Sequence, residues 1–238
     1  RRGKPCWYIK DDNNYCSVSD PYFLENLTYL VINHYFSKYP VDVKSDIIKL
    51  FNFTEFKTAF GQFIDMSPKD PTIDNWNLTV INKTSYYSIW CPFVCGLCAS
   101  QKIPKDIWNS DNLREILIRA GKLFQCQDDW IDIYGSSAKI GKIGSDIQEG
   151  KVTWLFAKAI ELADDQQKKL LLENNGHSEQ SKVDMVKKIY KDLNIEEICI
   201  KHQDEEYEGI KEMLSQVDSQ VPKGLIKFLL SFLDHRKY

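Results

Sequence analysis

Residues 110–134 read SDNLREILIRAGKLFQCQDDWIDIY, and their pattern points to the fold class. Apolar side chains recur every three or four residues, which is the spacing of one buried face of an α-helix. This stripe is formed by Leu113, Ile116, Leu117, Ala120, Leu123 and Phe124. We therefore predict a long amphipathic helix from Ser110 to Tyr134.

Similar patterns lie on both sides of this helix. The expected helices cover residues 20–39, 44–65, 74–100, 110–134, 146–162, 178–193, 195–217 and 221–233. The first begins with Asp20 as a cap and Pro21 at the first helical position, and a glycine-rich stretch from Gly135 to Ser145 interrupts the series. No internal repeat or domain-separating linker is present. We predict one all-α domain spanning residues 1–238, built as a bundle of long, mostly buried helices.

The composition agrees with a helical globular protein. The chain has 31 Lys and Arg against 34 Asp and Glu, a net charge of −3, with 11 Gly and 8 Pro among 238 residues. This charge excludes a generally basic nucleic-acid surface, because phosphate affinity requires clustered positive charge. The longest apolar run, residues 86–99, contains Pro92 and is shorter than the roughly 20 residues of a membrane span. We expect it to form a buried helix.

The cysteines indicate the compartment. There are seven, an odd number without the dense spacing of a small secreted framework. A reducing compartment fits this pattern, and we expect the cytoplasm. Cys91, Cys95 and Cys98 recur at helical spacing among apolar residues, so we expect them to pack in the core rather than bind metal.

The end of the 110–134 helix carries the strongest chemical signal. Asp128 and Asp132 share one helical face, Gln125 lies one turn earlier, and Asp129 lies a step round the helix. Three carboxylates near a helix C-terminus repel one another and face an unfavourable dipole. A magnesium site that in turn holds a phosphate would use them, since Mg²⁺ takes one or two carboxylates plus substrate oxygens. A solvated acidic patch is the alternative that this pattern alone leaves open.

A lysine loop follows the aspartates. Lys142 lies between Gly141 and Gly144, just before the helix expected at residue 146, which Ser145 or Asp146 would cap. A phosphate-binding lysine beside metal-binding aspartates would form one anion site. The glycine spacing is not that of a nucleotide P-loop.

Polar residues also interrupt two apolar helices upstream. Gln62 and Asp65 share a helical face, and Lys83 and Thr84 open the apolar stretch that ends at Ala99. Buried polar groups are costly unless they are paired or line a cavity. Each could be a satisfied core group, but together they fit a polar pocket inside the bundle.

These motifs carry a family resemblance. They are RRGKPCWY (1–8), GQFID (61–65), NKTSYYS (82–88), FQCQDDWIDIYG (124–135) and GKIGSDIQEGK (141–151). In this order they resemble the trans-isoprenyl diphosphate synthases, specifically the farnesyl diphosphate synthases of animals and fungi. The resemblance implies an isoprenoid-synthase-type bundle of helices around a deep central cavity, usually a homodimer.

The resemblance also implies an activity. It is the head-to-tail condensation of isopentenyl diphosphate with dimethylallyl or geranyl diphosphate, which gives farnesyl diphosphate. The allylic diphosphate would ionise while three Mg²⁺ ions hold its diphosphate, and the isopentenyl double bond would attack the cation. Electrostatic clamping suits this chemistry, because negative charge accumulates on the leaving group.

Carried over residue by residue, the resemblance assigns roles. Asp128, Asp129 and Asp132 resemble the second aspartate-rich motif, with Asp128 as a direct metal ligand. Catalytic roles fall to Lys83, Thr84 and Gln125. The substrate-binding residues would be Arg1, Arg2, Gln62, Lys83, Thr84, Gln125, Lys142 and Lys151. Arg1 and Arg2 would grip both diphosphates, while Lys83, Lys142 and Lys151 would contact the allylic one. Thr84 and Gln125 would lie by the developing cation, Asp65 beside Gln62 on the allylic side, and Asp146 by the metal-bound waters.

One family feature is absent from the sequence. The first aspartate-rich motif, DDxxD, ends in the family a few residues before Arg1-Arg2-Gly3, and the helices that carry it are missing here. We therefore expect a fragment or processed form that is inactive as it stands. The missing helices should leave apolar faces of residues 20–39 and 86–99 uncovered.

Two other functions remain open. One is a terpene synthase derived from isoprenyl synthases, which ionises its substrate without condensing it. Arg1, Arg2, Lys83 and Gln125 argue against it, because a cyclase does not need a second diphosphate site. The other is a catalytically silent, truncated paralogue that acts as the helical partner in a heterodimer.

Overall fold

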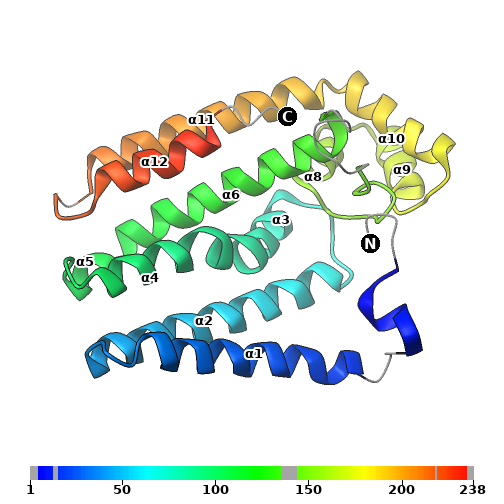
Figure 1. Cartoon of the computed structure of the whole chain (residues 1–238). Coiled ribbons are helices and arrows are strands. Elements are labelled where there is room, and N and C mark those ends of the chain that lie inside the picture. Colours follow the sequence, from blue (N-terminus) through cyan, green and yellow to red (C-terminus); the bar gives the residue numbers. More distant parts are fainter. Residues whose placement is uncertain (1–4, 13–15, 136–143, 218, 235–238) are drawn as a thin grey trace. The chain divides into compact units, whose positions relative to one another are not determined.

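A computed structural model of the chain describes residues 5–12, 16–135, 144–217 and 219–234 (Figure 1). Within these ranges every regular element is a helix, which confirms the all-α prediction. The elements are η1 (Trp7–Asp12), α1 (Cys16–Tyr35), α2 (Val41–Met66), α3 (Ile73–Val80), η2 (Ile81–Trp90), α4 (Cys91–Ser100), α5 (Lys105–Trp108), α6 (Asp111–Tyr134), α8 (Trp154–Leu162), α9 (Asp165–Asn174), α10 (Gln180–Asp192), α11 (Ile195–Ser215) and α12 (Lys223–Leu233).

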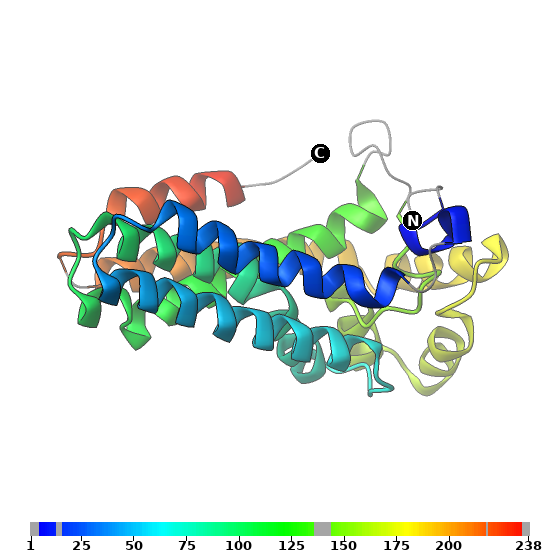
Figure 2. The same ribbon diagram turned by 60° about the horizontal axis from the view of Figure 1, so that its bottom comes forward.

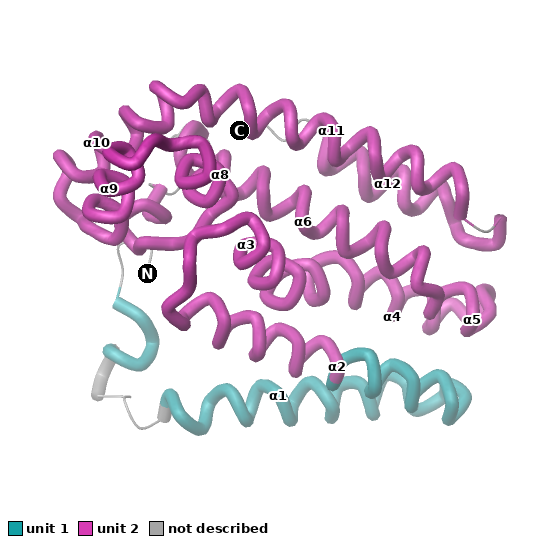
Figure 3. Tube along the Cα trace, turned by 180° about the vertical axis from the view of Figure 1, so that it is seen from behind, with its two compact units in different colours: residues 1–52 teal, residues 53–238 magenta. Residues whose placement is uncertain are grey.

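The chain divides into two compact units, residues 1–52 and 53–238 (Figure 3). The prediction of a single domain over residues 1–238 remains a prediction.

In the first unit, the indole N–H of Trp7 donates to Asp20 over 2.6 Å. Asp20 therefore does not cap a helix as expected. Helix α1 begins earlier, at Cys16, and contains Pro21.

Apolar side chains of α1 are exposed, as the sequence predicts. Phe23 is 72% exposed, and Leu24, Leu27, Leu30 and Tyr35 are also exposed. The same expectation for residues 86–99 is wrong. Most of their apolar side chains are buried, from Tyr86 to Cys98, because η2 packs along α6.

Helix α6 lies at the centre of the second unit. It packs against η2 and α11, and α12 also contacts both α11 and α6 (Figures 1 and 2). The hydroxyl of Ser110 accepts the Leu113 N–H as the N-cap, and the helix ends at Tyr134, so the predicted boundaries are correct to one residue. The predicted stripe is buried from Leu113 to Leu123, and only Phe124 is half-buried.

Residues 74–100 form a continuous helical path, as expected, but its middle is not an α-helix. Between α3 and α4 the chain adopts a π-helix, η2, from Ile81 to Trp90. A π-helix is rare and costs regular hydrogen bonding, and it is found often at functional sites. This one carries Lys83 and Thr84.

The predicted helix at 146–162 begins too early. Residues 146–150 form turns, and α8 starts only at Trp154, with the Thr153 hydroxyl as its N-cap. Gly150 has a φ of +67°, which an α-helix does not accommodate. The expected capping by Ser145 or Asp146 is therefore wrong. Helix α9 was not predicted, although Asp164 and Gln167 form a complete capping box at its start.

No helix in the described ranges has both the length and the apolar character needed to cross a lipid bilayer.

Candidate active site

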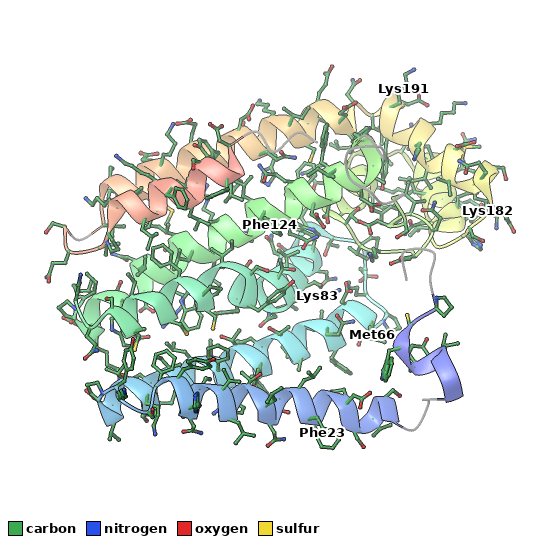
Figure 4. All side chains as sticks on the ribbon, viewed as in Figure 1. Phe23, Met66, Lys83, Phe124, Lys182 and Lys191 are labelled. Carbon is green, nitrogen blue, oxygen red and sulfur yellow. The ribbon has the colours of Figure 1, made fainter. Side chains whose placement is uncertain are left out.

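The candidate site is built on three segments of the second unit: η2, the C-terminal half of α6, and residues 144–151 before α8. Figure 4 labels Lys83 on η2 and Phe124 on α6, on neighbouring stretches of these two helices. Gly121 allows the close approach, since a Cβ there would lie 2.6 Å from the Cα of Ser85. The two helices therefore bring their polar side chains into direct contact.

A hydrogen-bonded chain links η2 to the aspartate motif. The Thr84 hydroxyl donates to Oε1 of Gln125 over 3.0 Å, and Nε2 of Gln125 donates to Oδ1 of Asp129 over 2.8 Å. Thr84 is buried, and Gln125 is half-buried. The structure thus brings together two residues that the sequence assigns to the developing cation.

Asp129 is a buried junction. Its Oδ2 accepts the indole N–H of Trp76 and the backbone N–H of Trp154, each over 2.9 Å. Burial raises the pKa of Asp129 to about 7 and the charge of Asp146 adds to this, whereas the three hydrogen bonds act in the opposite direction. Both carboxylate oxygens are therefore engaged by the protein, and they join α3, α6 and the first turn of α8.

Asp132 anchors the segment that precedes α8. Its Oδ2 accepts the backbone N–H of Asp146 over 2.9 Å. Gly144 lies directly on α6, because a Cβ there would come within 1.8 Å of the carbonyl oxygen of Asp132. Only glycine fits at this contact, so residues 144–146 follow the surface of α6 closely.

Lys151 returns to the same segment. Its ammonium contacts Asp146 Oδ1 at 2.6 Å and Glu149 Oε2 at 2.9 Å. Partial burial lowers the pKa of Lys151, but these two carboxylates outweigh it and raise the pKa above its usual value. The lysine therefore stays charged.

A second lysine lies on the η2 side. Nζ of Lys83 is 2.5 Å from Asp65 Oδ2, and Lys69 contacts the other oxygen of the same carboxylate at 3.5 Å. Gly61 permits α2 to approach, since a Cβ there would lie 2.2 Å from the backbone nitrogen of Lys83. Gln62, on the same turn of α2, is exposed. The side chain of Lys83 is one-third exposed, so it can still reach a ligand.

Of the remaining site residues predicted from the sequence, one is described by the structure and three are not. Asp128 is half-buried, and within the part of the chain that the structure describes its carboxylate has no hydrogen bond or ion pair. Arg1, Arg2 and Lys142 lie outside the described residues. The sequence reasoning missed Trp76 and Glu149. A buried tryptophan N–H needs an acceptor, which is a usable signal, but the sequence does not say which acceptor.

The donor set suits a hard cation shared with a phosphate. Among the described residues, no three His, Cys, Asp or Glu side chains converge as a closed metal cluster. Mg²⁺ does not need one, because it usually binds one or two carboxylates and completes its shell with water and phosphate oxygens. The carboxylate of Asp128, which has no partner among the described residues, lies one turn from Asp132 and fits that requirement.

Sequence comparisons give consistent relatives. A profile of the family described as polyprenyl synthetase matches residues 1–193. Farnesyl pyrophosphate synthase from Zea mays is 36% identical over 248 residues, covering 100% of this chain and 68% of that protein. The farnesyl pyrophosphate synthase from Panax ginseng is 33% identical over 245 residues, covering 100% of this chain and 70% of that protein.

Solved structures agree with the sequence comparisons. T. brucei farnesyl diphosphate synthase complexed with the bisphosphonate BPH-1326 superposes with a TM-score of 0.85 at 26% identity, covering 100% of this chain and 87% of that chain. Its complex with BPH-721 superposes with a TM-score of 0.86 at 26% identity, covering 100% and 72%. These superpositions confirm the fold that the motifs predict.

Proposed function

Because the chain belongs to the polyprenyl synthetase family, we propose that it condenses isopentenyl diphosphate with dimethylallyl or geranyl diphosphate to give farnesyl diphosphate. The observation that carries this proposal is the path of contacts from Asp132 through Asp146 to Lys151. It puts a fixed ammonium beside the aspartate motif, as the binding of a metal-bound diphosphate requires.

Lys83 and Lys151 would hold the allylic diphosphate from two sides. Each ammonium is now paired with carboxylates, which keep it oriented. A diphosphate would share these ammonium groups rather than replace their partners, because Lys offers three donors. In the same proposal Lys142 adds a third contact to this diphosphate, and Gln62 lines the allylic side.

Arg1 and Arg2 would grip the diphosphates of both substrates. An arginine presents a planar fork of donors that matches phosphate oxygens in pairs. Both residues belong to the motif at the start of the sequence, and this assignment rests on the family pattern alone.

Asp128 and Asp132 would hold Mg²⁺, and Asp129 would support them. Asp128 is available for a ligand, whereas both oxygens of Asp129 already accept hydrogen bonds. When bound, Mg²⁺ would neutralise negative charge on the diphosphate oxygens and so favour the departure of the diphosphate from the allylic group. The protein's own contribution is to hold the end of α6 that carries Asp128 and Asp132, through the contacts of Trp76 and Trp154 to Asp129.

Thr84 and Gln125 would lie beside the developing allylic cation. Their oxygen atoms are 3.0 Å apart and oriented by one hydrogen bond. Preorganised dipoles stabilise a developing charge without the cost of reorientation. The hydrogen-bonded chain Thr84–Gln125–Asp129 would therefore hold these dipoles in a fixed orientation while the allylic cation forms.

The direct test is product formation. The chain extended upstream by a segment that carries the family's DDxxD motif serves as the wild type. It is given Mg²⁺, isopentenyl diphosphate and geranyl diphosphate, and farnesyl diphosphate is measured by mass spectrometry. Residues 1–238 alone should give no product. We expect product from the wild type, loss of product in Asp128→Asn, and normal product in Asp111→Asn, whose side chain is 91% exposed on the first turn of the same helix. Consumption of geranyl diphosphate without isopentenyl diphosphate would instead indicate a terpene synthase, and no consumption of either would contradict the proposal.

We further propose a homodimer that forms through α1. The support is the exposed apolar face of this helix, which includes Phe23, Leu27 and Leu30. Contiguous apolar surface on a folded protein usually marks an association site. Light scattering should give a dimer for the wild type and a monomer for Leu27→Glu, whereas a monomeric wild type would contradict this assignment.

We also propose a cytoplasmic location. Cys6, Cys91, Cys95, Cys98, Cys126 and Cys199 are free thiols, including the buried pair Cys126 and Cys199 with sulfur atoms 3.6 Å apart. Thiols this close remain reduced most readily in a reducing compartment. Fluorescence microscopy of a tagged protein would test the location.

A further inference from the structure

Residues 145–151 hold two groups of the proposed site, Asp146 and Lys151, without forming a helix. Turn hydrogen bonds shape this segment: Glu149 N–H donates to Ser145 O over 2.9 Å, and Lys151 N–H to Asp146 O over 3.1 Å. Such turns are weak alone. Their geometry therefore depends on what packs against them from outside.

On one side the support is α6, through Asp132 and Gly144, as described above. On the other side it is the connection between α9 and α10. The backbone N–H of Gly176 donates to the carbonyl of Ile147 over 2.8 Å, and Gly150 N–H donates to the same oxygen over 3.2 Å. The side chain of Ile147 is itself buried in the core, which fixes the position of this carbonyl.

Gly150 and Gly176 meet backbone to backbone. A Cβ built on Gly150 would lie 3.0 Å from the Cα of Gly176. Both glycines have a left-handed conformation, with φ of +67° and +86°. Any L side chain is strained at such angles. The left-handed backbone therefore favours glycine at both positions, and Lys151 follows Gly150 directly.

The α9–α10 pair is firmly held, so it can act as a support. The two helices pack together, and Leu171 of α9 and Val186 of α10 are fully buried. A second link lies two residues past Lys151, where the side chain of Tyr190 on α10 meets that of Thr153. Two points on α9–α10 thus fix the segment from Ile147 to Thr153.

We propose that Gly176 is a positioning residue that sets the conformation of residues 146–151 and thereby the place of the Lys151 ammonium. This inference rests on the proposed function, in which Lys151 binds the allylic diphosphate. In this proposal Gly176 acts only through the backbone of Ile147 and Gly150. It lies far along the chain from every motif of the family resemblance.

A double-mutant cycle tests the inference. Binding of inorganic diphosphate in the presence of Mg²⁺ is measured by calorimetry for the wild type, Gly176→Ala, Lys151→Ala and the double variant. We expect Gly176→Ala to weaken binding about tenfold, the scale of one strained left-handed residue. In the Lys151→Ala background the same change should have no further effect, because the group it positions is gone.

Two controls separate backbone positioning from general damage. Gly96→Ala should bind like the wild type, since a Cβ there meets nothing within 4 Å. Gly176→Asn should recover most of the affinity, because Asn tolerates a left-handed backbone. If Gly176→Ala fails to fold, Gly176→Ser takes its place in the same cycle, with Gly176→Asn still as the control.

The outcomes distinguish this inference from the proposed function. A wild type that binds no diphosphate contradicts the proposed function. A wild type that binds, with Gly176→Ala binding equally well or with fully additive effects in the double variant, overturns the role of Gly176 alone. Steady-state kinetics add one readout: Gly176→Ala should raise the KM for geranyl diphosphate and leave the KM for isopentenyl diphosphate unchanged.

Discussion

The indole N–H of Trp76 donates to the buried carboxylate of Asp129 over 2.9 Å, and this bond joins α3 to the aspartate motif of α6. Trp76 is 2% exposed and Asp129 is 3% exposed. A buried carboxylate is costly unless its oxygens accept hydrogen bonds. The bond therefore lets an acidic motif sit at the edge of an apolar core, with Asp129 inside and Asp128 facing outward.

Trp76→Phe should lower the free energy of unfolding by about 1–3 kcal/mol, because it leaves a buried acceptor with one donor fewer. The matched control is Trp7→Phe. Trp7 also donates its indole N–H to an aspartate, Asp20, but both residues are on the surface. Urea denaturation should detect a large change for Trp76 and little for Trp7. Equal changes would mean that burial does not decide the strength of this bond.

Asp128→Ala should mainly affect turnover, whereas Asp129→Ala should mainly affect stability. Asp128→Ala should abolish turnover and leave stability unchanged or slightly higher, because it removes a metal ligand and relieves charge crowding on α6. Asp129→Ala should lower stability, because three buried donors lose their acceptor. Turnover at saturating Mg²⁺ and the urea midpoint are measured for both. Normal turnover in Asp128→Ala would refute its role as a ligand.

Lys83 and Lys69 share the Asp65 carboxylate but should differ in function. Lys83→Ala should raise the KM for the allylic diphosphate and slow its ionisation, because the ammonium contacts the diphosphate in ground and transition states. Lys142→Ala should have the same effect on the allylic diphosphate. Arg2→Ala should instead weaken the binding of isopentenyl diphosphate.

Lys69 is the matched control for Lys83. Its ammonium also contacts the backbone carbonyls of Ile64 and Asp65, each at 3.1 Å. Lys69→Ala should therefore lower stability while leaving both KM values near those of the wild type. If Lys83→Ala affected only isopentenyl diphosphate, the two subsites would have to be exchanged.

His202 should make stability depend on pH. Its ring stacks on Trp154 with centroids 4.8 Å apart, and burial lowers its pKa below 6.5. Lys122 and Lys158 act in the same direction, whereas Glu205 and Glu206 oppose it. At His202 the unfolded state therefore binds a proton first as the pH falls, so the contribution of this residue to stability should decline below about pH 6.5. The raised pKa of Asp129 acts in the opposite direction over the same pH range, so the contribution of His202 is taken as the difference between the wild type and His202→Phe, which keeps the stacking. From pH 7 to pH 5 the unfolding free energy of the wild type should decline relative to that of His202→Phe.

Much of the secondary structure is readable from the sequence because helical periodicity is a property of neighbouring residues. The stripe from Leu113 to Leu123 predicts both the extent of α6 and the face that it buries. The same local rule places Asp128 and Asp132 on one side of the helix. It fails at residues 146–153, where Asp146 N–H bonds to Asp132 and Gly150 turns left-handed, because those features depend on α6 and on Gly176 rather than on adjacent residues.

The sequence by itself determined that the chain is all-α, where its long helices run, and which polar residues interrupt their apolar faces. Only the tertiary structure decided how those polar residues are used. Asp128 and Asp129 are neighbours of identical chemistry, yet one is half-buried without a protein partner in the described ranges and the other accepts bonds from Trp76 and Trp154. The physical reason is that a buried polar group must find a partner, and packing brings that partner from a distant part of the chain.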